Sequence, residues 1–340
     1  MPLNEQVGRP LVTISMSTYN QEKYVRDSVR GLLSQTYEPL KIVISDDCST
    51  DNTWRIITEE VERYRKSGGI HTDIVLNRND INLGIALHSA KIGELIRGAG
   101  AVIKVGQGGD DISLPNRVER IVETWQTEHP AIILHNAIKI DVDGNAIGTV
   151  SERVLKGGVF GALSTYSVEA MSRFEPITEP LAYEDQIYSR RCRMFGKLSI
   201  IREPLIKYRV GSGVSTIQKN FRLRMARCIR AELASWRQTA KDVEWVKNEL
   251  PNADYARYRN EAMKSLAGLE RYLYLWESDS FSKRLFGFGA IGWRRFCGRS
   301  GVVAIILLLP HSCSDAILDF FLRVTSWIKR SWYQHCEKGR

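Results

Sequence analysis

The sequence predicts an α/β protein with a doubly wound, mostly parallel sheet that becomes mixed, followed by a mainly helical C-terminal region. Three observations predict this class. Short apolar segments alternate with helix-like stripes through the first hundred residues, polar clusters follow the apolar segments, and the pattern is helical from about residue 220 onward. With 340 residues, 43% of them hydrophobic, the chain is able to bury one large core, or one core and an appendage.

The first elements are expected to form a β-α-β unit. Apolar and polar residues alternate at positions 12–17 and predict a strand. Asn20 then resembles a helix cap, and an apolar helical stripe over residues 25–33 leads to a second strand at residues 40–44. Such an order predicts parallel strands joined by a right-handed crossover.

The alternation continues along the chain. The later expected elements are a helix at 54–64, a strand at 74–76, a helix at 88–95, a strand at 101–105, a helix at 118–125, a hairpin over 131–145, helices at 167–174 and 184–195, and a strand at 205–210. Gly196 is expected to end the helix at 184–195. We expect a domain boundary near Thr216, between a catalytic domain (1–216) and a mainly helical extension (217–340).

Three polar clusters follow expected strand ends, at residues 18–20, 46–47 and 110–111. In a doubly wound sheet of the Rossmann type, ligands bind beyond the carboxyl ends of the strands. We therefore expect these clusters to meet at one rim of the sheet.

The pair Asp110 and Asp111 follows a strand and the glycine-rich turn at 106–109. Hard divalent cations such as Mg²⁺ and Mn²⁺ prefer carboxylate oxygens and fill their remaining positions with water and phosphate oxygens. An acidic pair at a strand end also serves as a helix cap or a solvated turn, so the pattern alone leaves both interpretations open.

The other two clusters offer contacts for a nucleotide. Asp46 and Asp47 could accept hydrogen bonds from a base or a ribose, or could cap the next helix. Tyr19 could stack on a base or seal the edge of the core. The tripeptide from Asn82 to Gly84 could present backbone N–H groups to phosphate, or form a plain turn.

Glu184 and Asp185 begin an expected helix, where acidic residues favour the helix dipole. The alternative is a general base. Sugar transfer to an alcohol requires a carboxylate within hydrogen-bond reach of the attacking hydroxyl, and Asp185 is the candidate.

These motifs together resemble a known family. They are residues 15–20 (SMSTYN), 34–37 (SQTY), 46–53 (DDCSTDNT), 82–84 (NLG), 110–112 (DDI), 183–185 (YED) and the pair Tyr208-Arg209. In their joint order and spacing, residues 10–216 resemble glycosyltransferase family 2, whose members have the GT-A fold.

The resemblance implies inversion at the anomeric carbon by direct displacement, with a single base and no glycosyl-enzyme intermediate. Pattern and resemblance together give, as candidates for binding a nucleoside-diphosphate sugar, Thr18, Tyr19, Asn20, Asp46, Asp47, Asn82, Gly84 and Asp110. Asp110 and Asp111 are the implied ligands of Mg²⁺ or Mn²⁺, and Asp185 is the implied base. Glu184, Tyr208 and Arg209 are expected on the acceptor side or in support.

The sequence departs from the family pattern at two places. Gly108 stands where the usual Asp-x-Asp-Asp has its first Asp, and no His follows Tyr208-Arg209, where residues 210–213 read VGSG. We therefore expect Asp110 and Asp111 themselves to bind the metal ion.

The formal net charge of +9 is concentrated in the tail. Residues 281–340 hold ten Lys and Arg against three Asp and Glu, interleaved with aromatic residues and the apolar run at 301–309. This mixture favours an anionic membrane surface over nucleic acid as partner. A helical cap over the catalytic core, with the apolar run buried, is the open alternative.

Six cysteines lack metal-ligand spacing, and no apolar signal segment stands at the N-terminus. We expect a cytoplasmic protein, peripheral on the inner face of the cell membrane. The expected acceptor is a glycan or a lipid-linked saccharide in surface polysaccharide biosynthesis, such as O-antigen or capsule. The alternatives are a sugar nucleotidyltransferase, for which a Gly-rich, Lys/Arg-bearing phosphate loop is missing after the first strand, and a noncatalytic nucleotide-sugar-binding protein.

Overall fold

The computed structural model describes residues 8–71, 73–98, 100–150, 161–180, 182–212 and 221–277. The strands are β1 (Val12–Thr18), β2 (Leu40–Asp46), β3 (Ile74–Arg78), β4 (Ile103–Gly108), β5 (Ile112–Ser113), β6 (Ile132–Ile140), β7 (Ala146–Thr149), β8 (Ser164–Ser167) and β9 (Leu198–Arg209). The helices are α1 (Val25–Leu33), α2 (Thr53–Lys66), α3 (Ile85–Ile96), α4 (Arg117–Glu128), the 3₁₀ turn η1 (Gly161–Leu163), α6 (Val168–Ser172), α7 (Glu184–Phe195), α8 (Phe221–Trp245) and α9 (Asn252–Glu277).

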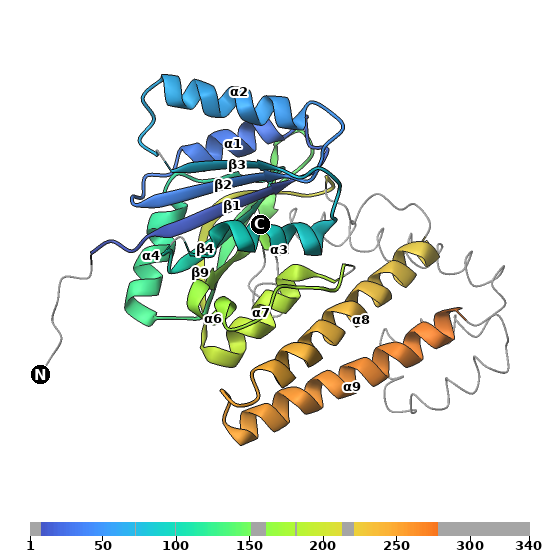
Figure 1. Ribbon diagram of the computed structural model, residues 1–340. Coiled ribbons are helices and arrows are strands. Elements are labelled where there is room, and N and C mark those ends of the chain that lie inside the picture. The colour runs from blue at the N-terminus through green and yellow to red at the C-terminus, as the bar shows by residue number, and fades with distance from the viewer. Residues whose placement is uncertain are drawn as a thin grey trace, which may run out of the picture. The chain divides into compact units, whose positions relative to one another are not determined.

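Within the described ranges the strands form one nine-stranded sheet in the order β3-β2-β1-β4-β8-β6-β9-β5, with β7 paired to β6 (Figure 1). The first four strands of this order run parallel. β8 then pairs antiparallel with both β4 and β6, while β6 and β9 are parallel. The predicted parallel sheet that becomes mixed is therefore confirmed, as is the hairpin of β6 and β7.

Apolar side chains pack on both faces of the sheet. Ile14 is fully buried in a cluster that includes Leu32 of α1 and Ile57 of α2, and residues of α4 join the same cluster. On the other face Val43 of β2 packs with Ile92 of α3. Figure 1 shows α1 and α2 on one side of the parallel strands and α3 on the other. Helices on both faces leave the strand ends as the place for a ligand site.

Two local predictions were wrong, and one strand was not expected. Asn20 does not cap α1, because the helix begins after Tyr24, and Asn20 lies in the left-handed region with φ of 51°. The region before residue 167 contains an unexpected strand, β8, whose polar Ser164 and Thr165 are buried inside the sheet. β9 begins at Leu198, well before the expected residue 205.

The chain divides into two compact units, one of residues 1–216 and 234–260, the other of residues 217–233 and 261–340. The described part of the second unit consists of portions of α8 and α9. The division of the chain at residue 216 stays a prediction. The basic, aromatic segment at 281–340 lies outside the described residues, and no helix in the described ranges is long and apolar enough to cross a membrane.

Candidate active site

The three polar clusters meet at the carboxyl ends of β1, β2 and β4, as the sequence predicted. Thr18 is in register with Asp46 across the parallel pair β1 and β2. The backbone N–H of Asp47 donates to the carbonyl of Thr18 at 2.9 Å, and that of Gly109 donates to the carbonyl of Ser17 at 3.0 Å. These backbone bonds fix the turns that follow the three strands against one another.

Asp46 is fully buried and holds the first two clusters together. Its Oδ1 accepts a hydrogen bond from Thr18 Oγ1 at 3.1 Å, and its Oδ2 accepts one from the Ser49 backbone N–H at 2.9 Å. The Arg78 guanidinium lies 3.5 Å from the same Oδ2. With its oxygens engaged inside the protein, Asp46 is arranged to position Thr18.

Asp47 organises the loop before α3. Its Oδ1 accepts from the Asn79 side chain at 2.8 Å and from the Leu83 N–H at 2.9 Å, and its Oδ2 accepts from the Gly84 N–H at 2.9 Å. Of the two interpretations of this tripeptide, these bonds favour the turn, because Asp47 accepts the N–H groups of Leu83 and Gly84, and a contact with phosphate stays a prediction. Gly84 has φ of 76°, a left-handed conformation that favours glycine.

Asp46 and Asp47 are buried, whereas other residues of this rim are exposed. The Tyr19 side chain is 41% exposed, so its ring is available for stacking. Asn20 is exposed too, and its Oδ1 accepts from the Thr50 N–H at 2.8 Å. Beside them, Oε1 of Gln21 is a buried acceptor with no hydrogen-bond partner among the described residues. A Cβ atom added to Gly109 would lie 2.3 Å from this oxygen, so Gln21 adjoins the turn that carries the acidic pair.

The acidic pair surrounds the space beside Gly108. A Cβ atom added there would lie 2.8 Å from Asp110 Oδ1 and 3.1 Å from Asp111 Oδ2. Each carboxylate therefore turns one oxygen toward the same point. A side chain at position 108 would fill that point, so glycine leaves it open.

The other oxygens of the pair are held from the end of β9. The backbone N–H of Arg209 donates to Asp111 Oδ1 at 2.9 Å, and Ser212 Oγ donates to Asp110 Oδ2 at 2.6 Å. The Arg209 side chain donates to the Asp110 carbonyl at 3.1 Å and to the Asp141 carbonyl at 2.8 Å. Ser212 belongs to the segment that lacks the family's His, and it binds one of the two acids instead.

The electrostatics of the pair fit a bound cation. Asp111 is buried, and this burial, with the negative charge of Asp110, raises the pKa of its carboxyl well above the usual range. Two carboxylates near each other in a buried place repel one another unless a proton or a cation compensates them. In the described ranges no three His, Cys, Asp or Glu side chains are grouped so that they could hold a metal ion, so the pair has no third ligand of these types there.

Below the acidic pair lies the fully buried side chain of Arg117. Its guanidinium donates to His135 Nε2 at 3.0 Å, to Ser113 Oγ at 2.8 Å, and to the carbonyls of Gly106 and Ala162 at 2.8 Å and 2.7 Å. Burial lowers the pKa of Arg117 to about 9, and the negative charge of Asp111 opposes this change. Arg117 thus ties the carboxyl end of β4 to η1.

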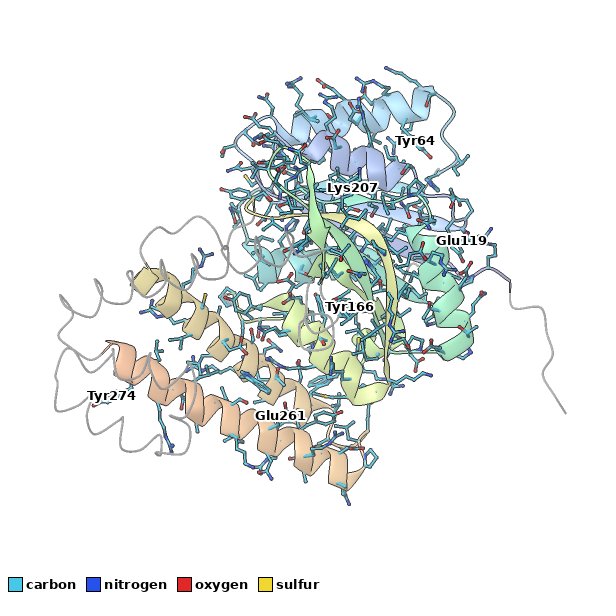
Figure 2. All side chains as sticks on the ribbon, turned by 180° about the vertical axis from the view of Figure 1, so that it is seen from behind. Tyr64, Glu119, Tyr166, Lys207, Glu261 and Tyr274 are labelled. Atoms are coloured by element: carbon cyan, nitrogen blue, oxygen red, sulfur yellow. The ribbon has the colours of Figure 1, made fainter. Side chains whose placement is uncertain are left out.

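The expected base stands at the start of α7, next to η1. A Cβ atom added to Gly161 would lie 3.6 Å from Glu184 Oε1 and 3.7 Å from Asp185 Cβ. Tyr166 of β8, labelled in Figure 2, is buried and donates from its hydroxyl to the Asp185 carbonyl at 3.3 Å. Burial and the charge of Asp185 raise the pKa of Glu184 to about 7, which the nearby Lys104 ammonium opposes.

Tyr208 connects the acidic pair with the expected base. Its pKa is raised to about 12, first by burial and then by the negative charges of Asp111, Asp110 and Asp185. Three carboxylates from two elements therefore act on one phenol. The contact between the two regions runs through η1, because a Cβ atom added to Gly106 of β4 would lie 2.9 Å from the Gly161 carbonyl oxygen, and one added to Gly161 would lie 3.6 Å from Glu184 Oε1.

A family model described as Glycosyl transferase family 2 matches residues 13–200, more than half of the chain. The chain belongs to glycosyltransferase family 2. The segment that matches runs from β1 into β9 and contains Asp110, Asp111 and Asp185. Of the site as described, Tyr208, Arg209 and Ser212 lie just beyond it.

Individual family relatives and solved structures agree. The chain is 26% identical over 220 residues to an uncharacterized glycosyltransferase of Nostoc sp., a match that covers 58% of this chain and 64% of that protein. The chain therefore spans just under two thirds of that relative.

Two solved structures share the fold. S. aureus TarS in complex with UDP-GlcNAc has a TM-score of 0.55 at 14% identity, over 87% of this chain and 86% of that one. The mannosyltransferase PcManGT from Pyrobaculum calidifontis, solved with GDP-Man and Mn²⁺, has a TM-score of 0.50 at 16% identity, over 84% and 81%. The expected GT-A fold is confirmed.

Sequence reasoning missed three residues of this family-2 site. Gln21, Arg117 and Ser212 each lie against the acidic pair or the turn that carries it. Gln21 and Ser212 lie in polar loops without a periodic signal. Arg117 opens α4 two residues after Pro115, and a charged residue there is ordinarily exposed, so the pattern gave no reason to expect it buried.

Proposed function

We propose that the chain is an inverting glycosyltransferase that moves one sugar from a nucleoside-diphosphate sugar to a hydroxyl group. The observation that carries the proposal is the position of η1, whose Gly161 lies against Gly106 of β4 and against Glu184 and Asp185 of α7, so that the acidic pair after β4 and the expected base lie on the same side of the sheet edge. Inverting transfer requires a site for the leaving diphosphate and a carboxylate for the attacking hydroxyl, on opposite sides of the sugar. Acids from two elements of one site supply both requirements.

For the donor, the exposed ring of Tyr19 is the surface on which a base would stack. Thr18 precedes Tyr19 in the chain and its carbonyl accepts the backbone N–H of Asp47, whereas the buried Asp46 would serve by positioning Thr18. Asn20, Asn82 and Gly84 stay candidates on the same rim. Supporting this assignment, the fold neighbours TarS and PcManGT were solved with UDP-GlcNAc and GDP-Man.

Asp110 and Asp111 would hold Mg²⁺ or Mn²⁺ through the oxygens that face the space beside Gly108. The cation supplies positive charge that stabilises the departing nucleoside diphosphate. The backbone N–H of Arg209 and the hydroxyl of Ser212 would keep the outer oxygens of the pair in place. The fold neighbour PcManGT was solved with Mn²⁺, in agreement with this proposal.

In the proposed reaction the acceptor oxygen attacks the anomeric carbon as the bond from that carbon to the diphosphate oxygen breaks. The acceptor proton moves to a carboxylate oxygen of Asp185. Glu184 stands beside it with a pKa raised to about 7, so near neutral pH it is partly protonated and able to donate a hydrogen bond to the acceptor. Tyr208 and Arg209 support this side of the site.

The proposed acceptor is a glycan or a lipid-linked saccharide, in the assembly of a surface polysaccharide such as O-antigen or capsule. The proposed location is the cytoplasmic face of the cell membrane, with segment 281–340 against anionic lipid. The charge and aromatic content of that segment support this part of the proposal, because basic and aromatic residues together favour the membrane interface.

The test is hydrolysis of a panel of UDP-, GDP- and dTDP-sugars by the full chain, with and without Mn²⁺ or Mg²⁺. We expect slow release of one nucleoside diphosphate that requires the metal. Release of pyrophosphate from a nucleoside triphosphate and a sugar phosphate would instead identify a nucleotidyltransferase. Binding of a nucleotide sugar without any turnover, with or without acceptor, would identify a noncatalytic binding protein.

A further inference from the structure

A pocket lies on the face of the sheet that α3, α6 and α7 cover, and the acidic pair is not part of its lining. Its volume is about 70 Å³, and Lys104 of β4 and Tyr188 of α7 are among its lining residues. The remaining walls are mostly apolar: α3 contributes Ala90, Gly93 and Ile96, and the segment from α6 onward contributes Val168, Met171, Phe174, Pro176 and Ile177. Concave apolar sites with few polar groups are the usual form of small-molecule sites.

The charge that distinguishes this pocket is the ammonium group of Lys104. The residue is 6% exposed, and among the described residues its Nζ makes no hydrogen bond and has no carboxylate within 4.0 Å. The Nζ atom lies over the face of the Tyr188 ring, 4.7 Å from the ring centre. A buried ammonium without a counter-ion is costly, and a bound anion would relieve that cost.

The other charged residues that line the pocket do not provide a counter-ion for Lys104. Arg191 is buried and bound through two 2.7 Å hydrogen bonds to Asp242, so its charge is already compensated. Arg97 and Glu175 are exposed and of opposite sign. Glu184 acts on Lys104 from the start of α7, but its own pKa of about 7 leaves it partly neutral near pH 7.

We propose that this pocket binds a small amphiphilic monocarboxylate, with its carboxylate on the Lys104 ammonium and its short apolar chain against α3 and residues 171–177. A monoanion matches the single uncompensated cation. Phosphate carries more charge and no apolar part, so it would meet Glu175 and leave the apolar walls without a partner.

The chain offers two variants that test the two halves of the ligand separately. Lys104→Met keeps a flexible side chain of similar length and removes the charge. Gly93→Leu fills the pocket from α3, where a Cβ atom would meet no heavy atom within 4 Å, so the change is compatible with the fold. Matched controls are Lys91→Met, exposed on the same helix, and Gly268→Leu in α9, where an added Cβ also has open space.

The experiment is calorimetric titration of the full chain with hexanoate, hexanol and inorganic phosphate. We expect saturable binding of hexanoate and binding of hexanol at least about tenfold weaker, because only the carboxylate makes a charge-assisted contact with Lys104. We expect no binding of phosphate, because it has no apolar part for the walls of the pocket. Lys104→Met should reduce hexanoate affinity to that of hexanol, and Gly93→Leu should abolish both. Both control variants should bind as the wild type does.

Any of four results would overturn the proposal. The first three are the lack of saturable hexanoate binding to the wild type, equal affinity for hexanoate and hexanol, and unchanged hexanoate binding by either Lys104→Met or Gly93→Leu. Binding of phosphate in competition with hexanoate would show a general anion site and would equally contradict a monocarboxylate site. Sugar transfer is tested separately, by hydrolysis of nucleotide sugars at the acidic pair.

Discussion

The backbone N–H of Arg209 donates a 2.9 Å hydrogen bond to Oδ1 of Asp111, joining two residues that are 98 positions apart in sequence. The bond fastens a buried carboxylate to the last residue of β9. The other carboxylate oxygen of Asp111 faces the space beside Gly108, and so does one oxygen of Asp110. A two-carboxylate site is thereby fixed in place without the third acid that the family pattern would supply at position 108.

Asp111→Asn should weaken metal-dependent nucleotide binding without lowering the stability of the fold. The amide oxygen can still accept from the Arg209 N–H, and loss of a buried charge whose pKa is raised should leave the metal-free protein at least as stable as the wild type. Binding of the preferred nucleoside diphosphate in Mn²⁺ should fall by about tenfold or more, to the metal-free level. Titration of UDP, GDP and dTDP with and without Mn²⁺, and thermal unfolding in chelator, measure both effects.

The control for this variant is Asp143→Asn, in the exposed turn between β6 and β7, which should change neither quantity. Equal affinity of the wild type for the preferred nucleotide with and without Mn²⁺ would refute the assignment of the metal to Asp110 and Asp111.

Arg117→Met should be among the most destabilising single changes in α4. It removes the buried guanidinium that donates to Ser113, His135 and the partly buried carbonyls of Gly106 and Ala162, and we expect a loss of about 2–5 kcal/mol in the free energy of unfolding. Arg120→Met, on an exposed position of the same helix, should change it little. Urea unfolding of both variants gives the comparison. A similar loss for the two would mean that the buried network contributes nothing specific.

The parts of the fold that sequence patterns predicted are those with a local cause. Helix α7 begins at Glu184 and ends before Gly196 as expected, because acids at the first turn and glycine at the end are local signals. β8 was missed because Ser164, Thr165 and Ser167 give no apolar alternation. Their burial comes from pairing with β4 and β6, strands more than twenty residues away in sequence.

The same distinction holds for the site. The meeting of the acidic clusters at one rim follows from the order of strands and helices alone. The engagement of Asp47 by Leu83 and Gly84 does not, because it depends on the path of a loop that lies 36 residues later in the chain. No local pattern tells whether a backbone N–H faces a ligand or a carboxylate of the protein itself.

Glu184→Gln should change how stability depends on pH. The folded-state pKa of Glu184 is about 7, above the value of 4.5 expected in the unfolded chain. Between these values the folded state binds more protons, so the free energy of unfolding falls as pH rises from 4.5 to 7. Gln does not titrate and loses no stability over this range. The free energy of unfolding of Glu184→Gln, relative to that of the wild type, should therefore increase from pH 4.5 to pH 7 by on the order of 2–3 kcal/mol.

The measurement is urea unfolding of both proteins at pH 4.5 and pH 8 in chelator, with the exposed Glu175→Gln as control. If the difference between Glu184→Gln and the wild type is the same at both pH values, Glu184 titrates in the folded protein as it does in the unfolded chain.

The segment at 281–340 should bring the full chain to anionic membranes. Neutralising Arg294, Arg295, Lys329 and Arg330 to Gln should lower affinity for phosphatidylglycerol vesicles by at least about tenfold, since a basic residue near an anionic surface contributes about 1 kcal/mol. Sedimentation with these vesicles and with neutral phosphatidylcholine vesicles measures it. Four exposed basic residues of the first unit, changed to Gln in a control, are Arg55, Lys66, Lys91 and Lys197. Equal losses for the two sets would mean that net charge, and not this segment, determines binding.

Asp185→Asn should remove the base while leaving the donor site intact. Asn keeps the size and hydrogen-bonding shape of the side chain but cannot accept the acceptor's proton. Donor affinity should therefore survive, while transfer falls by roughly 100-fold to 10,000-fold, the effect of losing a general base. The measurement is single-turnover transfer at saturating donor and acceptor, once an acceptor is known, together with donor affinity.

Glu184→Gln is the matched comparison, one residue away in the same helical turn. It should cost less in turnover if Glu184 serves as a hydrogen-bond donor to the acceptor, because Gln retains an N–H that can donate in its place. The order of the two variants identifies the base. Should Asp185→Asn keep near wild-type turnover while Glu184→Gln loses it, the proton goes to Glu184, whose pKa of about 7 already suits a general base near neutral pH.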